Sequence, residues 1–430
     1  MAVDEPSYRR RLPAGIVDSA FASLATFAVG LTAVTILDDV SRGVYAVYFT
    51  AFLLGVVLPR QVIFAPTTVE AVARPLPERM SVVPTGLRFG IGPGMIGALA
   101  VGIAFVVTAG YAERSVSIAL AITCGITIVL SPMQDFVRQS LHIAAHSWRA
   151  ASVSIVQFAA VIGAIALGLG LGIDDAWIPF GALAVANMIS LTVAWFVSSV
   201  GIDVATSEQL SFRAIVGQGV WLVQNEIAPA LFSFAVAAII AELASPEDLG
   251  FAESARVVAQ PILVLSAGLS AVLSPRAMRA AMDTDLGTAR HTRKVYLALV
   301  AAAGVGYVAI AGWDWALNPM AYIVPSAYGI SGLVAATVVA NFGISAVYLQ
   351  IHELMGARRE RALARIAWIS SPAILMGGLT AGYTGAFALA ISRVTGTSTR
   401  YILQDRVLRT VYDNPADSVA AAAPASGGPS

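Results

Sequence analysis

The sequence contains few charged residues and a single cysteine. Asp, Glu, Lys and Arg make up 12% of the 430 residues, and the formal net charge is zero. Ordinary soluble chains contain about 25% charged residues, so this composition excludes a typical soluble domain. The neutral balance argues against a nucleic-acid partner, and the basic residues are expected to meet anionic lipid instead. Cys124 cannot form an internal disulfide and is predicted to pack within an apolar helix.

The sequence also lacks any polar stretch long enough for a folded domain outside a membrane. Apolar runs fill it instead, and hydrophobic residues make up 57% of the chain. A helix needs ~20 apolar residues to cross ~30 Å of hydrocarbon, and twelve runs approach that length. The predicted spans are 14–37, 44–65, 89–109, 115–133, 150–172, 177–201, 214–241, 249–275, 295–313, 328–350, 363–380 and 382–402. The tail over 413–430 is rich in Ala, Pro, Ser and Gly and is predicted to be disordered.

Basic residues fall almost entirely in alternate gaps between these spans. Twenty-one of the 26 Lys and Arg residues lie before the first span, in every second gap after it, or around the C-terminal end. The other gaps hold only Arg42 and Arg114, whereas Arg60, Arg256 and Arg393 lie inside spans. The positive-inside rule therefore predicts that both termini are cytoplasmic, which an even number of spans also requires. Because the composition is typical of a GC-rich bacterium, the predicted location is a bacterial inner (cytoplasmic) membrane.

Two sequence patterns recur six spans apart. DDVSRG leads into the second span and SPEDLG into the eighth, which places Gly43 and Gly250 in equivalent positions. The chain reads RQSLHIAAHSWRA after span four and LQIHELMGARRERA after span ten. Six is an even number, so the two halves are predicted to cross the membrane in the same sense. We predict six-helix bundles over 1–201 and 214–412, joined by a cytoplasmic linker over 202–213.

These features resemble the multidrug/oligosaccharidyl-lipid/polysaccharide (MOP) exporter superfamily, and within it the polysaccharide or O-antigen flippase branch. The resemblance covers roughly residues 12–410 and rests on the span number, the two charged turns, and the Gln-to-basic loops after spans four and ten. It implies a central cavity lined mainly by helices one, two, seven and eight. The expected fold class is an all-α integral membrane protein, with twelve transmembrane helices in two parallel-repeat bundles of six around that cavity.

The resemblance also implies a function. A flippase of this branch moves a polyprenyl-phosphate-linked oligosaccharide from the inner to the outer leaflet by alternating access, for cell-surface polysaccharide synthesis. Its implied partners are membrane lipid, the lipid-linked glycan, a coupling ion (H⁺ or Na⁺), and a polysaccharide polymerase or glycosyltransferases. No cofactor is expected. The lipid II flippase branch commonly has fourteen helices, whereas this chain has twelve predicted spans.

Two other functions stay open. The multidrug branch has twelve helices, so a cation-coupled multidrug efflux antiporter is the first alternative. A membrane-embedded glycosyltransferase is the second, because Asp38 and Asp39 stand in the first outer gap. Such enzymes resemble one another in a long first loop, which this sequence lacks, and an Asp38 that caps the turn is the simpler prediction. No nucleophile–base pattern or phosphate-binding loop occurs in the sequence, so we predict a transporter and not an enzyme.

Ionisable residues at membrane depth point to ion pairs or water-filled cavities, because each costs about 2.5–3.5 kcal/mol on insertion scales. Asp18 in span one and Arg60 in span two lie at similar depths, and adjacent antiparallel helices would bring them together. One interpretation is an internal ion pair that determines helix packing. The other is that Arg60 faces an anionic headgroup while Asp18 holds it in place.

Span seven carries the strongest site signal, Gln224-Asn225-Glu226 followed by Pro229. Three consecutive polar residues cannot share one helix face, because neighbours differ by about 100°. A local irregularity around Pro229 is therefore predicted, and irregular backbone at this depth lines a cavity or is buried in protein.

Span eight carries three polar residues at i, i+3 and i+7, which predicts one polar stripe. A cavity lining and an interfacial ion pair between Glu253 and Arg256 are both compatible with it. The predicted substrate-binding set is Asp18, Arg60, Gln224, Asn225, Glu226, Glu253, Arg256 and Gln260, with no catalytic or metal-binding residue.

The remaining polar residues carry structural expectations. The isolated amides Gln157, Asn187 and Asn341 predict hydrogen bonds between helices. His142 and His146 have the i, i+4 spacing of metal ligands without a third ligand nearby, so an amphipathic interfacial helix is preferred over a metal site.

Overall fold

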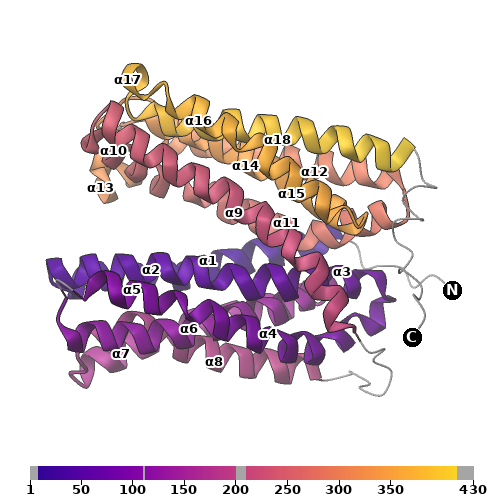
Figure 1. The fold of residues 1–430 in the computed structure, drawn as a ribbon, viewed down its shortest axis with the longest axis horizontal. Coiled ribbons are helices and arrows are strands. Elements are labelled where there is room, and N and C mark those ends of the chain that lie inside the picture. The colour runs from indigo at the N-terminus through magenta and orange to yellow at the C-terminus, as the bar shows by residue number, and fades with distance from the viewer. Residues whose placement is uncertain (1–7, 110–111, 200–209, 414–430) are drawn as a thin grey trace. The chain divides into compact units, whose positions relative to one another are not determined.

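The computed structural model describes residues 8–109, 112–199 and 210–413, which are helical almost throughout (Figure 1). The chain divides into two compact units, Met1–Val223 and Gln224–Ser430, and the boundary falls inside one long helix. No β-strand occurs in the described ranges. The all-α membrane fold expected from hydropathy is confirmed.

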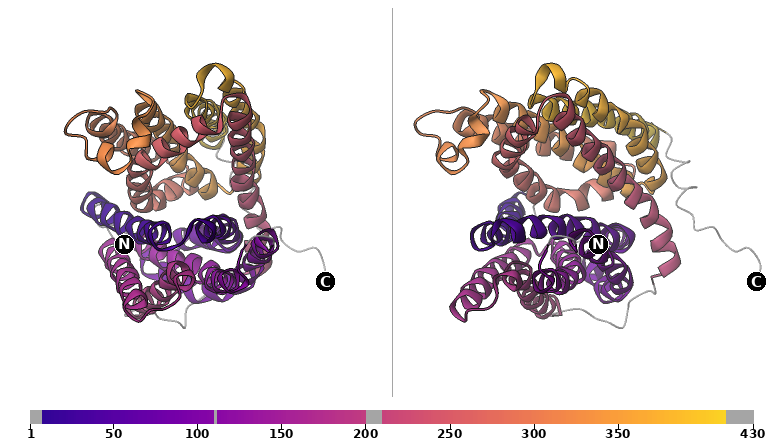
Figure 2. Two further views of the ribbon diagram at one scale, coloured as in Figure 1. Left: turned by 90° about the vertical axis from the view of Figure 1, so that its left-hand side faces the viewer. Right: turned by 60° about the vertical axis from the view of Figure 1, so that its left-hand side comes forward.

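The first unit is a bundle of long helices that pack side by side, as both views in Figure 2 show. α1 packs against α7, α7 and α6 against α8, and α2 against α4 and α6. A π-helix joins α2 to α3 without a break. The elements are α1 (Tyr8–Ile36), α2 (Asp39–Pro59), π-helix η1 (Arg60–Phe64), α3 (Ala65–Ala73), 3-10 helix η2 (Leu76–Val82), α4 (Val83–Ala98), α5 (Ala100–Thr108), α6 (Arg114–Ile143), α7 (Ser147–Gly170), 3-10 helix η3 (Asp175–Trp177) and α8 (Ile178–Ser199).

In the second unit α14 packs against α11, α12 and α18, and α16 packs against α18. The helix α9 (Phe212–Leu243) enters it from the first unit. The other elements are α10 (Pro246–Val258), α11 (Gln260–Met282), α12 (Leu286–Ala311), α13 (Pro319–Ile323), 3-10 helix η5 (Pro325–Tyr328), α14 (Leu333–Gly356), α15 (Glu360–Ser370), α16 (Pro372–Gly378), α17 (Ala381–Thr384) and α18 (Phe387–Asp413).

Ten helical segments in the described residues are long and apolar enough to cross a membrane. They correspond to the first ten predicted spans. The last two spans correspond to α15–α16, which is interrupted at Ser371, and to α17–α18, which is interrupted at Gly385. The predicted division at 202–213 stays a prediction, and residues 200–209 lie outside the described ranges.

Large apolar side chains lie on the surface while many polar ones are buried, the reverse of a soluble protein. Leu99, Val106 and Phe234 are each more than two-thirds exposed, whereas Asp18 and Glu353 are fully buried. Exposed apolar area on this scale suits a hydrocarbon solvent. Cys124 is fully buried, as predicted, in an apolar cluster that includes Tyr48 and Phe180.

The turn after the first span is capped by Asp38, as the sequence predicts. Its Oδ1 accepts hydrogen bonds from the N–H groups of Val40 (2.9 Å) and Ser41 (3.0 Å), and its Oδ2 accepts one from the Ser41 hydroxyl (2.6 Å). The Ser41 hydroxyl and then its N–H stabilise the carboxylate and lower the pKa of Asp38. This cap leaves Asp38 with a structural role that needs no glycosyltransferase chemistry.

Three helices in the described residues, α6, α11 and α14, end in the same unusual geometry. Ala145 after α6 and Arg358 after α14 both have positive φ, 66° and 55°, and lie about 210 residues apart. In each turn the next N–H donates to a carbonyl five residues back, from His146 to Leu141 (2.8 Å) and from Arg359 to Leu354 (2.9 Å). A left-handed residue here closes a Schellman-type cap, and because the same cap also ends α11 at Thr284, it does not by itself test the predicted repeat.

The charge bias makes a prediction about topology. Alkaline phosphatase fused at Asp174 or Glu247 should be active, because these positions are predicted to lie outside the cytoplasm. Green fluorescent protein fused at Arg290 or Arg359 should fluoresce, because the arginine-rich gaps are predicted to be cytoplasmic. Alkaline phosphatase and green fluorescent protein fusions measure this directly. The opposite location at any two of these sites would contradict the predicted orientation.

Candidate functional site

A cluster of ionisable side chains is buried inside the first unit around Asp18 of α1. The Asp18 Oδ2 lies 2.6 Å from a terminal nitrogen of Arg138 and 3.0 Å from Nε2 of His142, both on α6. Its Oδ1 accepts a hydrogen bond of 2.6 Å from the Ser154 hydroxyl on α7. Asp18, His142 and Ser154 are each buried. One carboxylate thus joins three helices.

Arg138 links this buried carboxylate to a more exposed one. Its second terminal nitrogen donates to Asp135, one turn earlier on α6, at 2.8 Å. The side chain of Asp135 is 45% exposed, whereas that of Asp18 is 1% exposed. The burial of Asp18 is therefore compensated by the arginine and two further donors. Such compensation is what permits a charge at membrane depth.

Buried amides form a second polar group in the first unit. Gln157, one turn beyond Ser154 on α7, donates to the Asn187 Oδ1 on α8 at 2.7 Å, and Gln134 on α6 lies 3.5 Å from the Gln157 Oε1. The predicted interhelical hydrogen bonds of Gln157 and Asn187 are confirmed. Buried polar side chains of this unit therefore form two hydrogen-bonded groups, one around Asp18 and one around Gln157.

The expected contact between Asp18 and Arg60 is wrong. Asp18 bonds Arg138, His142 and Ser154 instead, and Arg60 is exposed and makes no ion pair among the described residues. The reason is packing: α1 lies mainly against α7 and α8 and has few contacts with α2. Helices consecutive in sequence, such as α1 and α2, are therefore not always main packing partners. The substrate-binding role assigned to Asp18 and Arg60 stays a prediction.

The pairing of Asp18 with Arg138 and His142 was not predicted, because hydropathy ended the fourth span at residue 133. The helix α6 in fact continues to Ile143, which carries both residues on one face at i, i+4 spacing. His142 is consequently 1% exposed and paired with Asp18, not part of an interfacial helix as expected, whereas His146 beyond the helix end is exposed. The sequence signal for this site was the i, i+4 spacing of Arg138 and His142 directly after an apolar run, which indicates that the helix continues and carries both residues on one face.

The irregular backbone predicted for span seven occurs in span two. α9 is helical from Phe212 to Leu243 and passes through Pro229 without a break. In span two, Pro59 is followed by the π-helix Arg60–Phe64, in which the Ala65 N–H donates to the Arg60 carbonyl. One turn of π-helix inside an α-helix inserts an extra residue, and such turns are frequent at functional sites.

The π-helix packs directly against the first half of α9. Val62, Ile63 and Phe64 are buried. Gly219 of α9 lies so close to Val62 that a Cβ at this position would clash with the backbone carbonyl and Cα of Val62. Glycine is therefore required by the approach of the two backbones. Arg60 begins the π-helix at this junction.

In the second unit the three polar residues predicted in span seven differ in how much of each side chain is exposed. Asn225 is buried, and its Oδ1 accepts a 2.6 Å hydrogen bond from Arg400 of α18. Its Nδ2 lies 3.3 Å from Glu226 Oε1. Gln224 is half-buried and Glu226 is exposed, as expected of three neighbours on a regular helix. Arg400 lies inside the twelfth predicted span, but it was not among the residues that the sequence predicted for a site.

Glu253 and Arg256 form an i, i+3 ion pair on α10, as one of the two interpretations predicted. The expected stripe does not extend to Gln260, because α10 ends at Val258 and α11 begins at Gln260. Pro261 lacks the N–H that would continue the ladder, and the Asn341 Nδ2 bonds the Ala259 carbonyl at 2.9 Å. Asn341 thus forms its predicted interhelical hydrogen bond at the helix break.

Within the ranges that the structure describes, no group of three or more His, Cys, Asp or Glu side chains is arranged to hold a metal ion. The donor set around Asp18 contains an arginine and a hydroxyl beside one histidine, and a guanidinium repels a metal cation. The cluster is a network of ion pairs and hydrogen bonds around one carboxylate.

Comparison with known proteins defines the fold. No protein-family model and no curated protein matches the sequence. A MATE structure in the straight conformation superposes with a TM-score of 0.74 at 10% identity, over 96% of each chain. This chain has the fold of MATE transporters. An outward-facing multidrug resistance MATE family transporter of the MOP superfamily gives 0.70 at 12% identity, over 95% of this chain and 97% of that one.

A third MATE-fold neighbour shows that this fold accommodates different pocket chemistries. It is a MOP superfamily transporter from Pyrococcus furiosus, described as having a binding pocket of reverse polarity that suggests a different function. It gives a TM-score of 0.67 at 11% identity, over 94% of this chain and 96% of that one. The superfamily predicted from sequence thus agrees with the MATE neighbours, and at these identities the agreement concerns the fold.

Proposed function

We propose that this protein is a proton-coupled membrane transporter that exports a small organic solute. The observation that carries the proposal is the buried cluster of Asp18, Arg138, His142 and Ser154. Chains of carboxylate and histidine inside membrane helices are typical of proton relays. The MATE-fold neighbours support the efflux role over the flippase role, because one of them is described as a multidrug resistance transporter.

The coupling step follows from the bonds of Asp18. A proton taken up by the Asp18 carboxylate cancels the charge that attracts Arg138. The carboxylic acid then carries a donor where Arg138 also presents a donor, so the link from α1 to α6 weakens. When Asp18 is protonated, α1 would pack differently against α6. When Asp18 loses the proton, α1 would return to its original packing. A population shift of this kind drives transport when the two states bind solute with different affinity.

The direct test uses purified protein in liposomes with an imposed pH difference. Ethidium movement and the opposing proton flux are recorded together with fluorescent reporters. Wild-type protein should move ethidium only when the pH gradient is present, and each transport event should dissipate part of it. Gradient-independent ethidium movement, or none at all with a panel of organic cations, would reject the proposal.

A second candidate is translocation of a lipid-linked, polyprenyl-phosphate oligosaccharide, which one observation favours. Arg60 is exposed, makes no ion pair within the described residues, and begins the π-helix in span two. An uncompensated arginine at membrane depth is costly unless it meets water or an anionic ligand, and a phosphate would satisfy its fork of donors. The partners of this role would be the lipid-linked glycan and the enzymes that make or polymerise it.

The two candidates differ in what a deletion and an Arg60 variant do. If the glycan role holds, deletion makes lipid-linked glycan accumulate on the inner leaflet, and Arg60→Gln reproduces this while Arg60→Lys restores part of the activity. Arg88→Gln is the matched control, because Arg88 is also exposed and lies in α4, next to the start of the third predicted span. Unchanged glycan export together with greater dye sensitivity would leave only the efflux role.

A further inference from the structure

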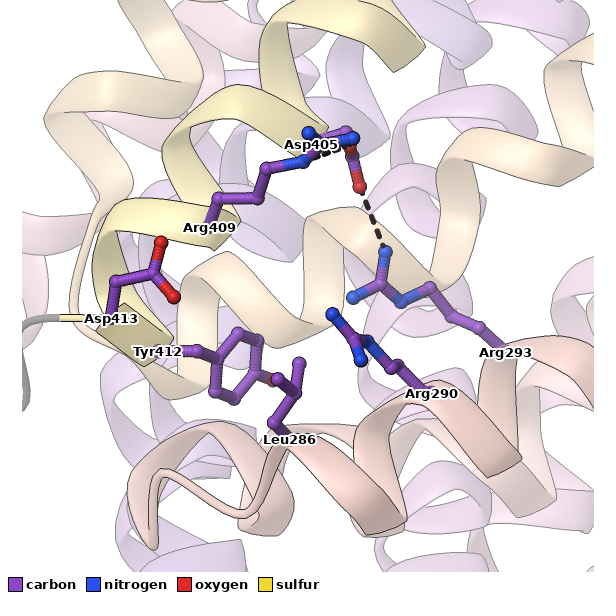
Figure 3. Close-up of a pocket in the computed structure, with 7 residues that line it drawn as sticks. All are labelled: Leu286, Arg290, Arg293, Asp405, Arg409, Tyr412 and Asp413. Atoms are coloured by element: carbon purple, nitrogen blue, oxygen red, sulfur yellow. Dashed lines mark hydrogen bonds and ion pairs between the residues drawn. The ribbon is translucent and has the colours of Figure 1, made fainter.

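A solvent-accessible pocket lies at the end of the second unit where α12 begins and α18 ends. Its volume is about 380 Å³, and Figure 3 shows its lining. The side chains come from the first two turns of α12 and the last two of α18. They are Leu286, Arg290, Arg293, Asp405, Arg409, Tyr412 and Asp413. None of them belongs to the cluster around Asp18 or to the residues predicted to bind the transported substrate.

The pocket carries more positive than negative charge, three guanidinium groups against two carboxylates. Asp405 accepts from Arg293 at 3.3 Å and from Arg409 at 2.8 Å, so it compensates two arginines at once. Arg290 forms no hydrogen bond or ion pair with the described residues. Its guanidinium lies beside that of Arg293 in Figure 3. Arg290 therefore leaves donors available for an anion, beside Arg293, which shares Asp405 with Arg409.

A buried ion pair behind the pocket holds its wall in place. The Arg293 Nε lies 2.9 Å from the Glu353 Oε1 on α14, and the Glu353 side chain is fully buried. The Tyr412 hydroxyl donates to the other Glu353 oxygen at 3.0 Å. Arg293 and Tyr412 are therefore anchored from behind, while Arg290 and Arg409 face the open side. Pre-positioned donors reduce the entropy lost when a ligand binds.

We propose that this pocket binds the phosphate group of an anionic phospholipid headgroup. Guanidinium groups match phosphate oxygens in a bidentate geometry. Leu286 and the ring of Tyr412 add an apolar side, which suits the glycerol and first methylenes of a lipid better than a free inorganic anion. The positive-inside bias places this end of α12 and α18 at the cytoplasmic leaflet, where basic pockets between helices meet anionic headgroups.

The experiment measures binding of phosphatidylglycerol by the purified full chain in detergent, with native mass spectrometry and thermal unfolding as readouts. Phosphatidylcholine, a zwitterion with no net charge, is the comparison lipid. Arg290→Gln should weaken phosphatidylglycerol binding about fivefold, the factor expected for one arginine near an anionic headgroup. Asp413→Asn should strengthen it, because the substitution removes a negative charge from the same wall. Arg406→Gln is the matched control, an exposed arginine of α18 outside the lining.

A second arm identifies the source of the phosphate. Added inorganic phosphate or glycerol phosphate that displaces phosphatidylglycerol, with the same dependence on Arg290, would show a phosphate site open to soluble ligands. No displacement at millimolar concentration would show that the lipid tails are needed. If Arg290→Gln binds phosphatidylglycerol and phosphate as wild type does, or if Arg406→Gln loses as much affinity, the proposal is overturned. Equal unfolding midpoints of the lipid-free variants would confirm that folding is not the cause.

Discussion

Asp18→Ala is expected to abolish transport and to lower the free energy of unfolding by about 3–5 kcal/mol, the usual cost of removing one partner from a buried ion pair. The substitution leaves Arg138 without its buried carboxylate and leaves His142 and Ser154 without their acceptor. Ethidium flux in liposomes measures the first effect, and the unfolding midpoint in detergent measures the second.

Asp18→Asn separates the coupling role from the structural one. The amide keeps the volume and one acceptor oxygen, so the protein should insert and fold, but it cannot exchange a proton. Proton-coupled flux should therefore disappear while protein levels stay near normal. Asp135→Asn is the control, because Asp135 accepts from the same Arg138 but is half-exposed. Equal loss of flux in both variants would argue against a coupling role specific to Asp18.

Double substitutions identify the partner of Asp18. The combination of Asp18→Ala with Arg138→Ala should recover much of the stability lost in Asp18→Ala, because no unpaired charge remains, without recovering coupled transport. The combination with Arg60→Ala should show simple additivity, since Arg60 and Asp18 do not touch. Non-additivity with Arg60 instead would contradict the observed arrangement of α1, α2 and α6.

Gly219→Ala is expected to produce the second large effect, a destabilisation of about 1–3 kcal/mol from overpacking together with loss of transport. The added Cβ would meet the backbone of Val62, which cannot move aside as a flexible side chain can. The π-helix Arg60–Phe64 would have to shift or unwind to an α-helix. Thermal unfolding and liposome flux report the two effects.

Gly217→Ala is the matched control for that experiment. Gly217 lies half a turn away on α9, and a Cβ there would meet nothing within 4 Å. Alanine also favours the helix more than glycine does, so this variant should be as stable as wild type or slightly more stable. A Gly219→Ala protein that behaves like Gly217→Ala would show that the π-helix does not depend on this contact.

Local chemistry was predictable wherever it depends on residues close in sequence. The Asp38 cap needs only Ser41 three residues later, and the ion pair of Glu253 with Arg256 needs only one helical turn. Isolated amides such as Asn341 were predictable for a different reason, since an amide in hydrocarbon must find a partner on another helix. Which partner it finds was not predictable.

The sequence by itself determined that the chain crosses a membrane repeatedly as helices, because apolar run length and backbone hydrogen bonding in hydrocarbon leave no other solution for these runs. It did not determine which helices are neighbours. Only the tertiary structure decided that Asp18 meets α6 and α7 instead of Arg60 on α2. It also decided that the irregular turn follows Pro59 and not Pro229, because the backbone of Gly219 packs against that turn. Both outcomes depend on contacts between residues far apart in the chain, for which hydropathy and spacing carry no information.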